Sequence, residues 1–146
     1  MEILVKSLVK AKGFRLSLAR KVARKALEVE SYKEAQVSIL FCEDAYIKRL
    51  NRKYRGVDAP TDVLAFSMHE GKFSKVHPEV LGDVVISLET ASRQAKRFRH
   101  SLNKETILLV IHGILHLLGY DHLKKKDKEL MRRKEKQILK SLNIKE

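Results

Sequence analysis

The longest apolar segment of the chain, residues 107–118, is interrupted by two histidines and a glycine. It is well short of the roughly 20 residues needed to cross a bilayer, and a helix that is apolar on most of its surface is normally buried. Ser101 or Asn103 is placed to cap its start, and Gly119 suits the left-handed position just past a helix C-terminus. The segment therefore predicts a buried central helix on which the other elements pack.

The rest of the chain alternates between helix and strand patterns. Helices are predicted over about 16–29, 44–54 and 88–97, and strands over 36–41, 63–66 and 84–86. A basic helix is predicted to begin near Lys124, with a partial apolar stripe that includes Met131 and Ile138. The length of 146 residues fits a single domain over 1–146.

The charge of the chain favours a polyanionic partner. It carries 31 Lys and Arg against 18 Asp and Glu, a formal net charge of +13, with an apolar fraction of 44%. That apolar fraction is ordinary for a globular protein, so the excess charge belongs to a folded surface. Nucleic acid is the usual polyanion that such a surface attracts, and anionic membrane is the weaker alternative.

Cysteine usage and the N-terminus bear on the compartment. Cys42 is the only cysteine, so the chain has no intrachain disulfide and no cysteine-based zinc site. The first residues place lysines inside their apolar stretch and lack the continuous apolar region of a signal peptide. We therefore expect a cytoplasmic protein with no membrane-spanning segment.

The sequence HGILHLLGYDH, residues 112–122, has the spacing of a metal site. His112 and His116 lie four residues apart, so on a helix they share one face. Gly119 permits the chain to reverse, and His122 can then point back to complete a three-imidazole site. Three neutral nitrogen ligands suit zinc, and an open fourth position is typical of a catalytic site. We predict one Zn²⁺ per chain, with other divalent metals as alternatives.

Another interpretation is that His112 and His116 are core histidines bonded to carbonyl groups and that His122 is a turn residue. Each unpaired ring in an apolar helix would cost roughly 1–3 kcal/mol, and a third histidine follows at metal spacing, so the metal site is favoured. Asp121 could orient a ligand or stabilise the turn through its own backbone, and the two roles are equally supported. Tyr120 is expected to pack rather than react.

The spacing HxxxHxxGxxH also occurs in zinc endopeptidases whose motif begins HExxH. Gly113 stands where those enzymes have the glutamate that acts as general base. Peptidase activity is therefore disfavoured, and proton transfer would need another group. His69, His77 and His100 have no metal spacing and are predicted to be loop or surface residues.

HGILHLLGYDH resembles the signature of the YbeY family, bacterial rRNA maturation factors described as metal-dependent single-strand endoribonucleases. Two upstream segments support the resemblance, LNRKYRGVDAPTDVLAFS at 50–67 and LGDVVIS at 81–87. The first of these departs from the family's usual LSFP at Ala65 and Ser67. Recognisable similarity covers about residues 45–123.

The resemblance implies an α+β fold in which a small mixed β-sheet is packed by several helices, with a buried central helix that carries the HxxxH metal motif. It places the metal ligands on His112, His116 and His122. It also places a catalytic arginine on Arg55, which would neutralise a phosphate oxygen as charge builds on phosphorus. Without the resemblance, Arg55 would be interpreted as part of a solvated helix end.

The function implied is that of a zinc-dependent endoribonuclease, a hydrolase of phosphodiester bonds in single-stranded RNA, active in small-subunit rRNA 3′-end maturation and ribosome quality control. Its partners would be ribosomal RNA and the ribosome or ribosomal proteins. One alternative is a non-enzymatic RNA-binding ribosome-assembly factor with a structural metal; a zinc peptidase is less favoured. Candidate phosphate contacts are Arg93, Lys96, Arg97, Arg99 and the 124–136 segment, although charge runs are usually solvated helix faces.

Overall fold

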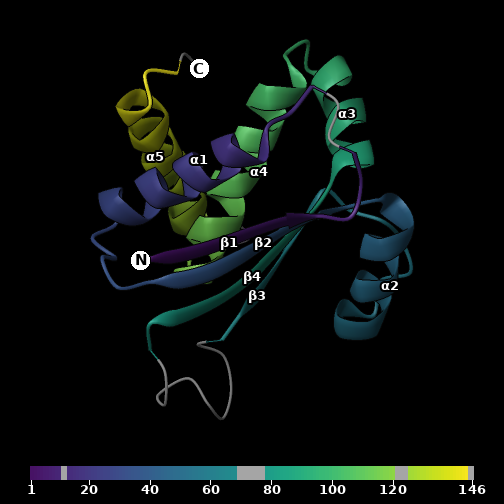
Figure 1. Ribbon diagram of the computed structural model, residues 1–146, viewed down its shortest axis with the longest axis horizontal. Coiled ribbons are helices and arrows are strands. Elements are labelled where there is room, and N and C mark those ends of the chain that lie inside the picture. The colour runs from purple at the N-terminus through teal and green to yellow at the C-terminus, as the bar shows by residue number, and fades with distance from the viewer. Residues whose placement is uncertain (11–12, 69–77, 121–124, 145–146) are drawn as a thin grey trace.

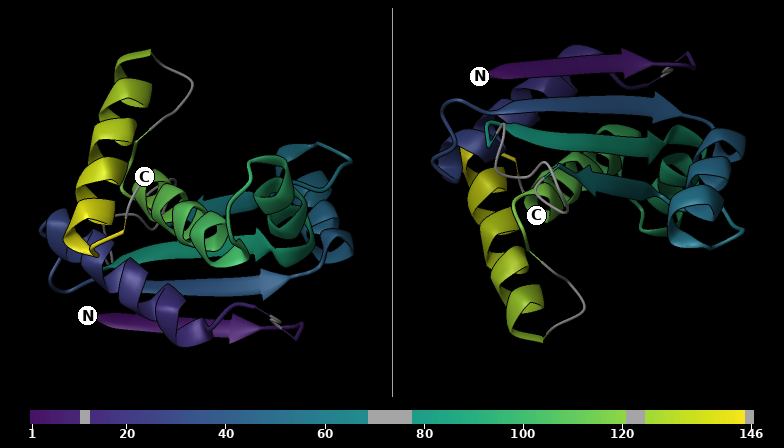
Figure 2. Two further views of the ribbon diagram at one scale, coloured as in Figure 1. Left: turned by 90° about the horizontal axis from the view of Figure 1, so that it is seen from above. Right: turned by 90° about the horizontal axis from the view of Figure 1, so that it is seen from below.

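The computed structural model describes residues 1–10, 13–68, 78–120 and 125–144, apart from the side chain of Lys125. The elements within these ranges are β1 (Glu2–Ser7), α1 (Leu16–Val29), β2 (Gln36–Cys42), α2 (Asp44–Arg55), β3 (Val63–Ser67), β4 (Val80–Ser87), α3 (Leu88–Arg97), α4 (Leu102–Leu117) and α5 (Lys125–Ser141). Their arrangement is shown in Figure 1 and, from above and below, in Figure 2. No helix in these ranges combines the length and apolarity needed to cross a membrane.

The strands form one mixed sheet in the order β1-β2-β4-β3. β1, β2 and β4 run parallel, and β3 pairs antiparallel with β4 and forms one edge. Parallel neighbours cannot be joined by a tight turn, which is why a helix follows β1 and another follows β2 along the chain. The expected α+β fold with a small mixed sheet packed by helices is confirmed.

The two faces of the sheet are covered unequally because alternate residues of each strand point to opposite sides. On one side lies the main core, formed with residues from α1, α3, α4 and α5. On the other lies the small core, made by Cys42, Ile47, Leu64 and Val85 with partly buried Leu40, Tyr46, Leu50 and Phe66. The only helix that contributes to the small core is α2, which stands apart from the other helices in Figure 1.

The buried central helix predicted around residues 107–118 is α4, whose buried residues run from Glu105 to Leu117. Of the two candidate caps, Ser101 serves, because its hydroxyl accepts the Lys104 N–H at 3.0 Å. Gly119 follows the helix with a φ of 102°, as predicted. Glycine tolerates this conformation without steric cost.

Several element boundaries agree with the sequence patterns. α1 and α3 match the predicted ranges, and Ser87 caps α3 by accepting the Thr90 N–H at 3.3 Å. β1 was not predicted, because only Ile3 and Val5 of this edge strand are buried. Its strand conformation depends on pairing with β2, which a local pattern does not disclose.

Candidate active site

His112 and His116 lie one turn apart on α4, on its half-buried side. Their ring centroids are 4.7 Å apart, with an angle of 62° between the ring planes. Two imidazoles this close, from positions i and i+4 of one helix, can reach a single ion. Two neighbouring imidazole nitrogens suit a zinc-type ion. His112 and His116, the two predicted ligands within the described residues, are therefore compatible with such an ion.

Gly113, the residue in the glutamate position of the peptidase motif, is where α4 approaches the sheet. A Cβ added there would lie 2.5 Å from Cγ1 of Val84 and 3.1 Å from its Cγ2. The valine side chain is stiff, so it cannot easily move aside. The absence of a glutamate at this position therefore has a packing cause: α4 lies too close to β4 for any side chain.

Arg55, the predicted catalytic residue, ends α2 and is exposed. Its Nη2 donates to the carbonyl oxygen of Ala65 on β3 at 2.7 Å, and its Cζ lies 5.5 Å from the centroid of the Phe66 ring. The guanidinium carries five N–H donors in a planar fork, and this bond takes one of them. Arg55 is thus an exposed helix-end residue whose guanidinium is also held against an edge strand, and its catalytic role stays a prediction.

The bond from Arg55 is possible because the Ala65 carbonyl points off the sheet. Met68 N–H donates to Leu81 at 2.9 Å and Ser87 N–H to Asp62 at 3.0 Å, so both of these cross-strand pairs are hydrogen-bonded. Hydrogen-bonded and non-bonded pairs alternate along an antiparallel ladder. The register then makes Ala65 a non-bonded position, with its backbone groups facing the open edge.

The cross-strand pair of Ala65 and Val84 relates Arg55 to the histidine helix. Ala65 pairs with Val84, and Val84 lies directly beneath Gly113 of α4. Arg55 and the residue next to His112 thus contact the two partners of one cross-strand pair. The arginine and the histidine helix are therefore linked through one cross-strand pair, with α4 on the face of the main core and α2 on the face of the small core.

The remaining predicted histidines are placed as follows. His69, His77 and His122, together with Asp121, lie outside the described residues. Among the residues that the structure does describe, no group of three His, Cys, Asp or Glu side chains gathers as a metal site. His100 lies in the loop between α3 and α4, as predicted, but its Nε2 pairs with the carboxylate of buried Glu105.

The sequence as a whole matches a family model described as Endoribonuclease YbeY over residues 7–143. The chain belongs to the YbeY family. The match extends well beyond residues 45–123, the range of the motif resemblance, and it includes all of α1 and α5.

Individual YbeY relatives agree with the family match. The protein named Endoribonuclease YbeY from Pelotomaculum thermopropionicum is 52% identical over 130 residues, which cover 87% of this chain and 86% of the relative. The protein of the same name from Desulforamulus reducens is 47% identical, over 88% of this chain and 87% of that one. The solution structure of TM1509 from Thermotoga maritima matches with a TM-score of 0.65 at 31% identity, over 94% of this chain and 86% of that chain.

In this YbeY-family chain, a buried carboxylate anchors the residue that follows the histidine helix. The Tyr120 hydroxyl donates to Glu30 at the end of α1, and Lys134 Nζ of α5 lies 3.2 Å from the same carboxylate. The Glu30 side chain is only 6% exposed. This three-way contact fixes Tyr120, which precedes His122 by two residues, and confirms that Tyr120 packs.

Two groups near these elements are unsuited to act as bases near neutral pH. Burial raises the pKa of Tyr120 to about 12, with Glu30 adding to the shift. Burial likewise raises the pKa of Cys42 to about 12. Both stay protonated at neutral pH, so neither the Cys42 thiol nor the Tyr120 phenol can act as a base there.

Arg93, a candidate phosphate contact, and Asp62, within the second motif, both have structural partners. The Nη2 of Arg93 donates to Asp44 at 2.7 Å. Asp62 accepts the Val63 N–H at 2.7 Å and a bond from Gln94 Nε2 at 3.3 Å, so it holds the turn before β3. Both residues therefore have a structural role, since Arg93 joins α3 to α2 and Asp62 stabilises the turn before β3.

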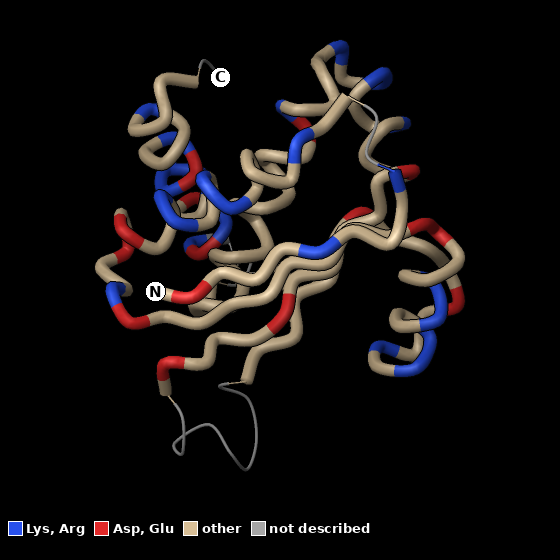
Figure 3. Tube along the Cα trace, in the orientation of Figure 1, with Lys and Arg blue, Asp and Glu red and all other residues tan. Residues whose placement is uncertain are grey.

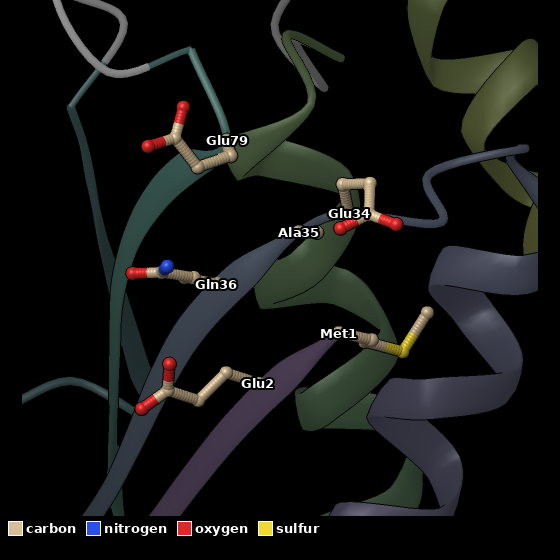
Figure 4. Close-up of a pocket in the computed structure, with 6 residues that line it drawn as sticks. All are labelled: Met1, Glu2, Glu34, Ala35, Gln36 and Glu79. Carbon is tan, nitrogen blue, oxygen red and sulfur yellow. The ribbon is translucent and has the colours of Figure 1, made fainter.

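Charged residues are distributed over both ends of the sheet. Lys and Arg line α2, and acidic residues lie near the start of β1 (Figure 3). A hollow of about 540 Å³ opens there, lined by Met1, Glu2, Glu34, Ala35, Gln36 and Glu79 (Figure 4). Its three carboxylates repel phosphate, so this hollow is the wrong sign for RNA. The exposed basic residues of α2, by contrast, would attract phosphate.

Sequence reasoning passed over Tyr54, although it lies inside the second motif. Tyr54 is 56% exposed, and its ring centroid lies 5.3 Å from that of Phe66. The available signal was an aromatic residue between two basic ones, Lys53 and Arg55. That pattern becomes informative only when the fold places a second ring beside it.

Proposed function

We propose that the chain is a zinc-dependent endoribonuclease that cleaves phosphodiester bonds in single-stranded RNA. The observation that carries the proposal is the pair of rings 4.7 Å apart on a buried helix that is linked to Arg55 through the sheet. Membership of a family described as Endoribonuclease YbeY supports the class of reaction. The net charge of +13 supports a polyanionic substrate.

Ribosomal RNA is the substrate that we propose, with the 3′-end maturation of small-subunit rRNA and ribosome quality control as the processes served. The ribosome or its proteins would then be partners, and the cytoplasm the compartment. These assignments rest on the motif resemblance. They can be tested by whether loss of the protein leaves unprocessed 3′ ends on small-subunit rRNA.

In this proposal His112, His116 and His122 hold one Zn²⁺ or another divalent ion. When bound, the ion supplies Lewis-acid chemistry, either by polarising the scissile phosphate or by acidifying a water molecule. Arg55 presents N–H donors to a phosphate oxygen, and such charge-assisted bonds strengthen as negative charge builds in the transition state. The Ala65 carbonyl keeps that guanidinium in place before substrate arrives, so little ordering is needed on binding.

Metal dependence is tested by substitution and by chelation together. His116→Ala is expected to abolish cleavage of single-stranded RNA while the circular dichroism spectrum and the RNA affinity persist. Chelation of the wild type should abolish cleavage, and added Zn²⁺ should restore it. Cleavage retained in His116→Ala would contradict the proposal, whereas joint loss of folding and RNA binding would favour an RNA-binding assembly factor with a structural metal.

Arg55 has a matched control one turn earlier in the same helix. Arg55→Ala is expected to lower kcat by about 10²–10³, as removal of one preorganised donor to a transition-state anion does. Arg52 is equally basic and exposed, and Arg52→Ala should leave kcat unchanged. An equal effect of both substitutions would mean that Arg55 contributes only to the general charge of the helix.

The nucleophile is identified from the product ends. Attack by the neighbouring 2′-hydroxyl leaves a 2′,3′-cyclic phosphate, whereas attack by water leaves none. Gly113 offers no carboxylate for proton transfer, so the internal route, in which the substrate supplies its own nucleophile, fits this helix better. Mass spectrometry of products after a short incubation separates the two routes.

A further inference from the structure

The residues around Tyr54 form a cluster of two rings and two cations at the end of α2. The Tyr54 and Phe66 rings meet edge to face at 5.3 Å and 65°. Lys53 Nζ lies 5.2 Å from the centroid of Tyr54, and Arg55 Cζ lies 5.5 Å from that of Phe66. Contact with Phe66 orients the tyrosine ring, yet 56% of the residue stays exposed.

Tyr54 is not simply the last residue of the small core. Tyr46, Leu50 and Tyr54 recur at four-residue intervals along α2, and the first two pack on the small core. Tyr54 continues the stripe past the point where the core ends. A single exposed ring needs no explanation by itself, so the charges around it must indicate whether it has a ligand.

Cations and rings alternate along this helix more than elsewhere in the described ranges. Three of the four cation–ring contacts found there lie on α2 and β3, namely Arg49 with Tyr46, Lys53 with Tyr54, and Arg55 with Phe66. No acid occurs between Lys48 and Arg55. On α5, by contrast, Asp127, Glu129 and Glu135 are interspersed among the basic residues. The segment from Lys48 to Arg55 therefore holds five cations with no acid among them, although α5 is also net positive.

The ligand that combines a chain of negative charges with planar rings is a single-stranded nucleic acid. Its phosphates suit the lysines and arginines, and each unpaired base can stack on an exposed aromatic side chain. An acidic peptide would use the charges but leave the rings unused. The cluster is linked to the histidine helix through the sheet, because Arg55 bonds to Ala65 and the strand partner of Ala65, Val84, packs on Gly113.

We propose that Tyr54, held in place by Phe66, is a stacking platform for one unpaired base of the RNA substrate. This inference rests on the proposed function and deepens it, because it identifies a residue that recognises single strands. A base within a duplex is stacked on its neighbours and cannot lie on the ring. The platform thus gives a physical reason for single-strand preference that the metal site does not supply.

The first test measures binding of a short 2′-O-methyl oligoribonucleotide, which resists internal cleavage, by fluorescence anisotropy. Tyr54→Ala should weaken binding about 5- to 150-fold, the range found for loss of one base–aromatic stack. Tyr54→Phe should bind like wild type, because stacking needs the ring and not the hydroxyl. Tyr54→Leu keeps an apolar contact with Phe66 but has no π-face, and it should bind like Tyr54→Ala.

The molecule contains a matched control. Phe98 is 57% exposed and has the Arg97 guanidinium 5.9 Å from its ring, so it reproduces the local chemistry at the end of α3. Phe98→Ala should leave the affinity unchanged. Equal effects of Tyr54→Ala and Phe98→Ala would overturn the platform.

An abasic oligonucleotide of the same length separates stacking from charge. It keeps the phosphates and lacks the bases, so wild type and Tyr54→Ala should bind it equally, and both more weakly than wild type binds the normal strand. A loss of affinity in Tyr54→Ala that is the same with and without bases would overturn the proposal. Thermal unfolding of each variant shows whether any loss comes from the fold instead.

Cleavage of the unmodified strand keeps this inference distinguishable from the proposed function. If the wild type cleaves RNA and Tyr54→Ala binds and cleaves as the wild type does, only the platform fails. If the wild type binds the strand through Tyr54 but does not cleave it with Zn²⁺ present, only the endoribonuclease proposal fails.

Discussion

The two sides of the sheet use their helices in opposite ways. On the side of the main core, α4 is buried along most of its length and carries the two histidines among apolar neighbours. On the other side, α2 buries only Ile47 and Asn51 and exposes a row of Lys and Arg. A polar ring inside α4 must be compensated, whereas a cation on α2 costs almost nothing.

This difference in burial determines how much a single residue reveals about function. A histidine within a buried helix needs a partner, so its presence is informative by itself. A lysine or arginine on an exposed helix is expected in any basic protein, so α2 is informative only through contacts that fix its side chains. Those contacts are the bond from Arg55 to Ala65 and the packing of Tyr54 on Phe66.

The largest expected effect on the free energy of unfolding comes from replacing one buried isoleucine with alanine in each of the two cores. Ile111 of α4 and Ile47 of α2 are both fully buried. Ile111→Ala should cost about 3–5 kcal/mol of unfolding free energy, and Ile47→Ala about 2–3 kcal/mol, because the small core leaves fewer neighbours around the cavity and can relax toward it. Urea denaturation of both variants measures the costs, and an equal or larger cost at Ile47 would mean that α2 contributes as much to the fold as α4 does.

The next effect tests the close approach of α4 to the sheet. Gly113→Ala adds a methyl group 2.5 Å from Val84 Cγ1 and should destabilise the protein by about 1–3 kcal/mol, although alanine is the better helix former. Val84→Ala removes the opposing methyl groups, so the double variant should be more stable than the sum of the single costs predicts. Strict additivity in thermal unfolding would show that the clash is relieved elsewhere.

A smaller effect concerns Asp44, which joins α2 to α3. Burial acts to raise the pKa of its carboxyl, but hydrogen bonds from Ser87, Thr90 and Arg93 outweigh burial and lower it below its usual 3.8. The ionised form therefore adds stability above about pH 3.8, and this stability is lost as the pH falls through the lower pKa of the folded protein. Asp44→Asn should cost about 1–2 kcal/mol at pH 7.

The pH dependence of that cost is the control. The difference between Asp44→Asn and wild type should shrink as the pH falls below about 3.8, because the carboxyl of the unfolded chain is protonated before that of the folded protein. Denaturant titrations at several pH values measure it. A difference that does not change with pH would assign the cost to altered hydrogen-bond geometry instead of charge.

What could be predicted from the sequence was mostly local. The periodicity of residues 16–29 depends on neighbours within a few positions, as does the cap at Ser101, one of the two caps predicted, so both features were found from the sequence. The histidine spacing is also local. The predicted zinc site and the role of His122 stay predictions.

The features that sequence could not predict arise between distant segments. Gly82 is one: a Cβ there would lie 2.0 Å from the carbonyl oxygen of Phe66, a contact set by the pairing of β3 with β4. The bond from Arg55 to Ala65 and the packing of Gly113 on Val84 depend on the same pairing. The sequence motifs include all three of these residues, but the contact that each one makes becomes visible only once β3 is paired with β4.

The last comparison, between one arginine of α2 and one of α5, involves the smallest change in stability but a clear change in RNA binding. Arg52 of α2 and Arg132 of α5 are both exposed, so replacing either with glutamine should change the unfolding free energy by no more than about 0.5 kcal/mol. If RNA lies along α2, Arg52→Gln should reduce the slope of log affinity against log salt by about 0.7, the loss of one phosphate contact to a single strand. Arg132→Gln should leave the slope unchanged, because α5 intersperses acids among its cations. The reverse result would move the RNA to the side of the main core and would separate Arg55 from the path of the substrate.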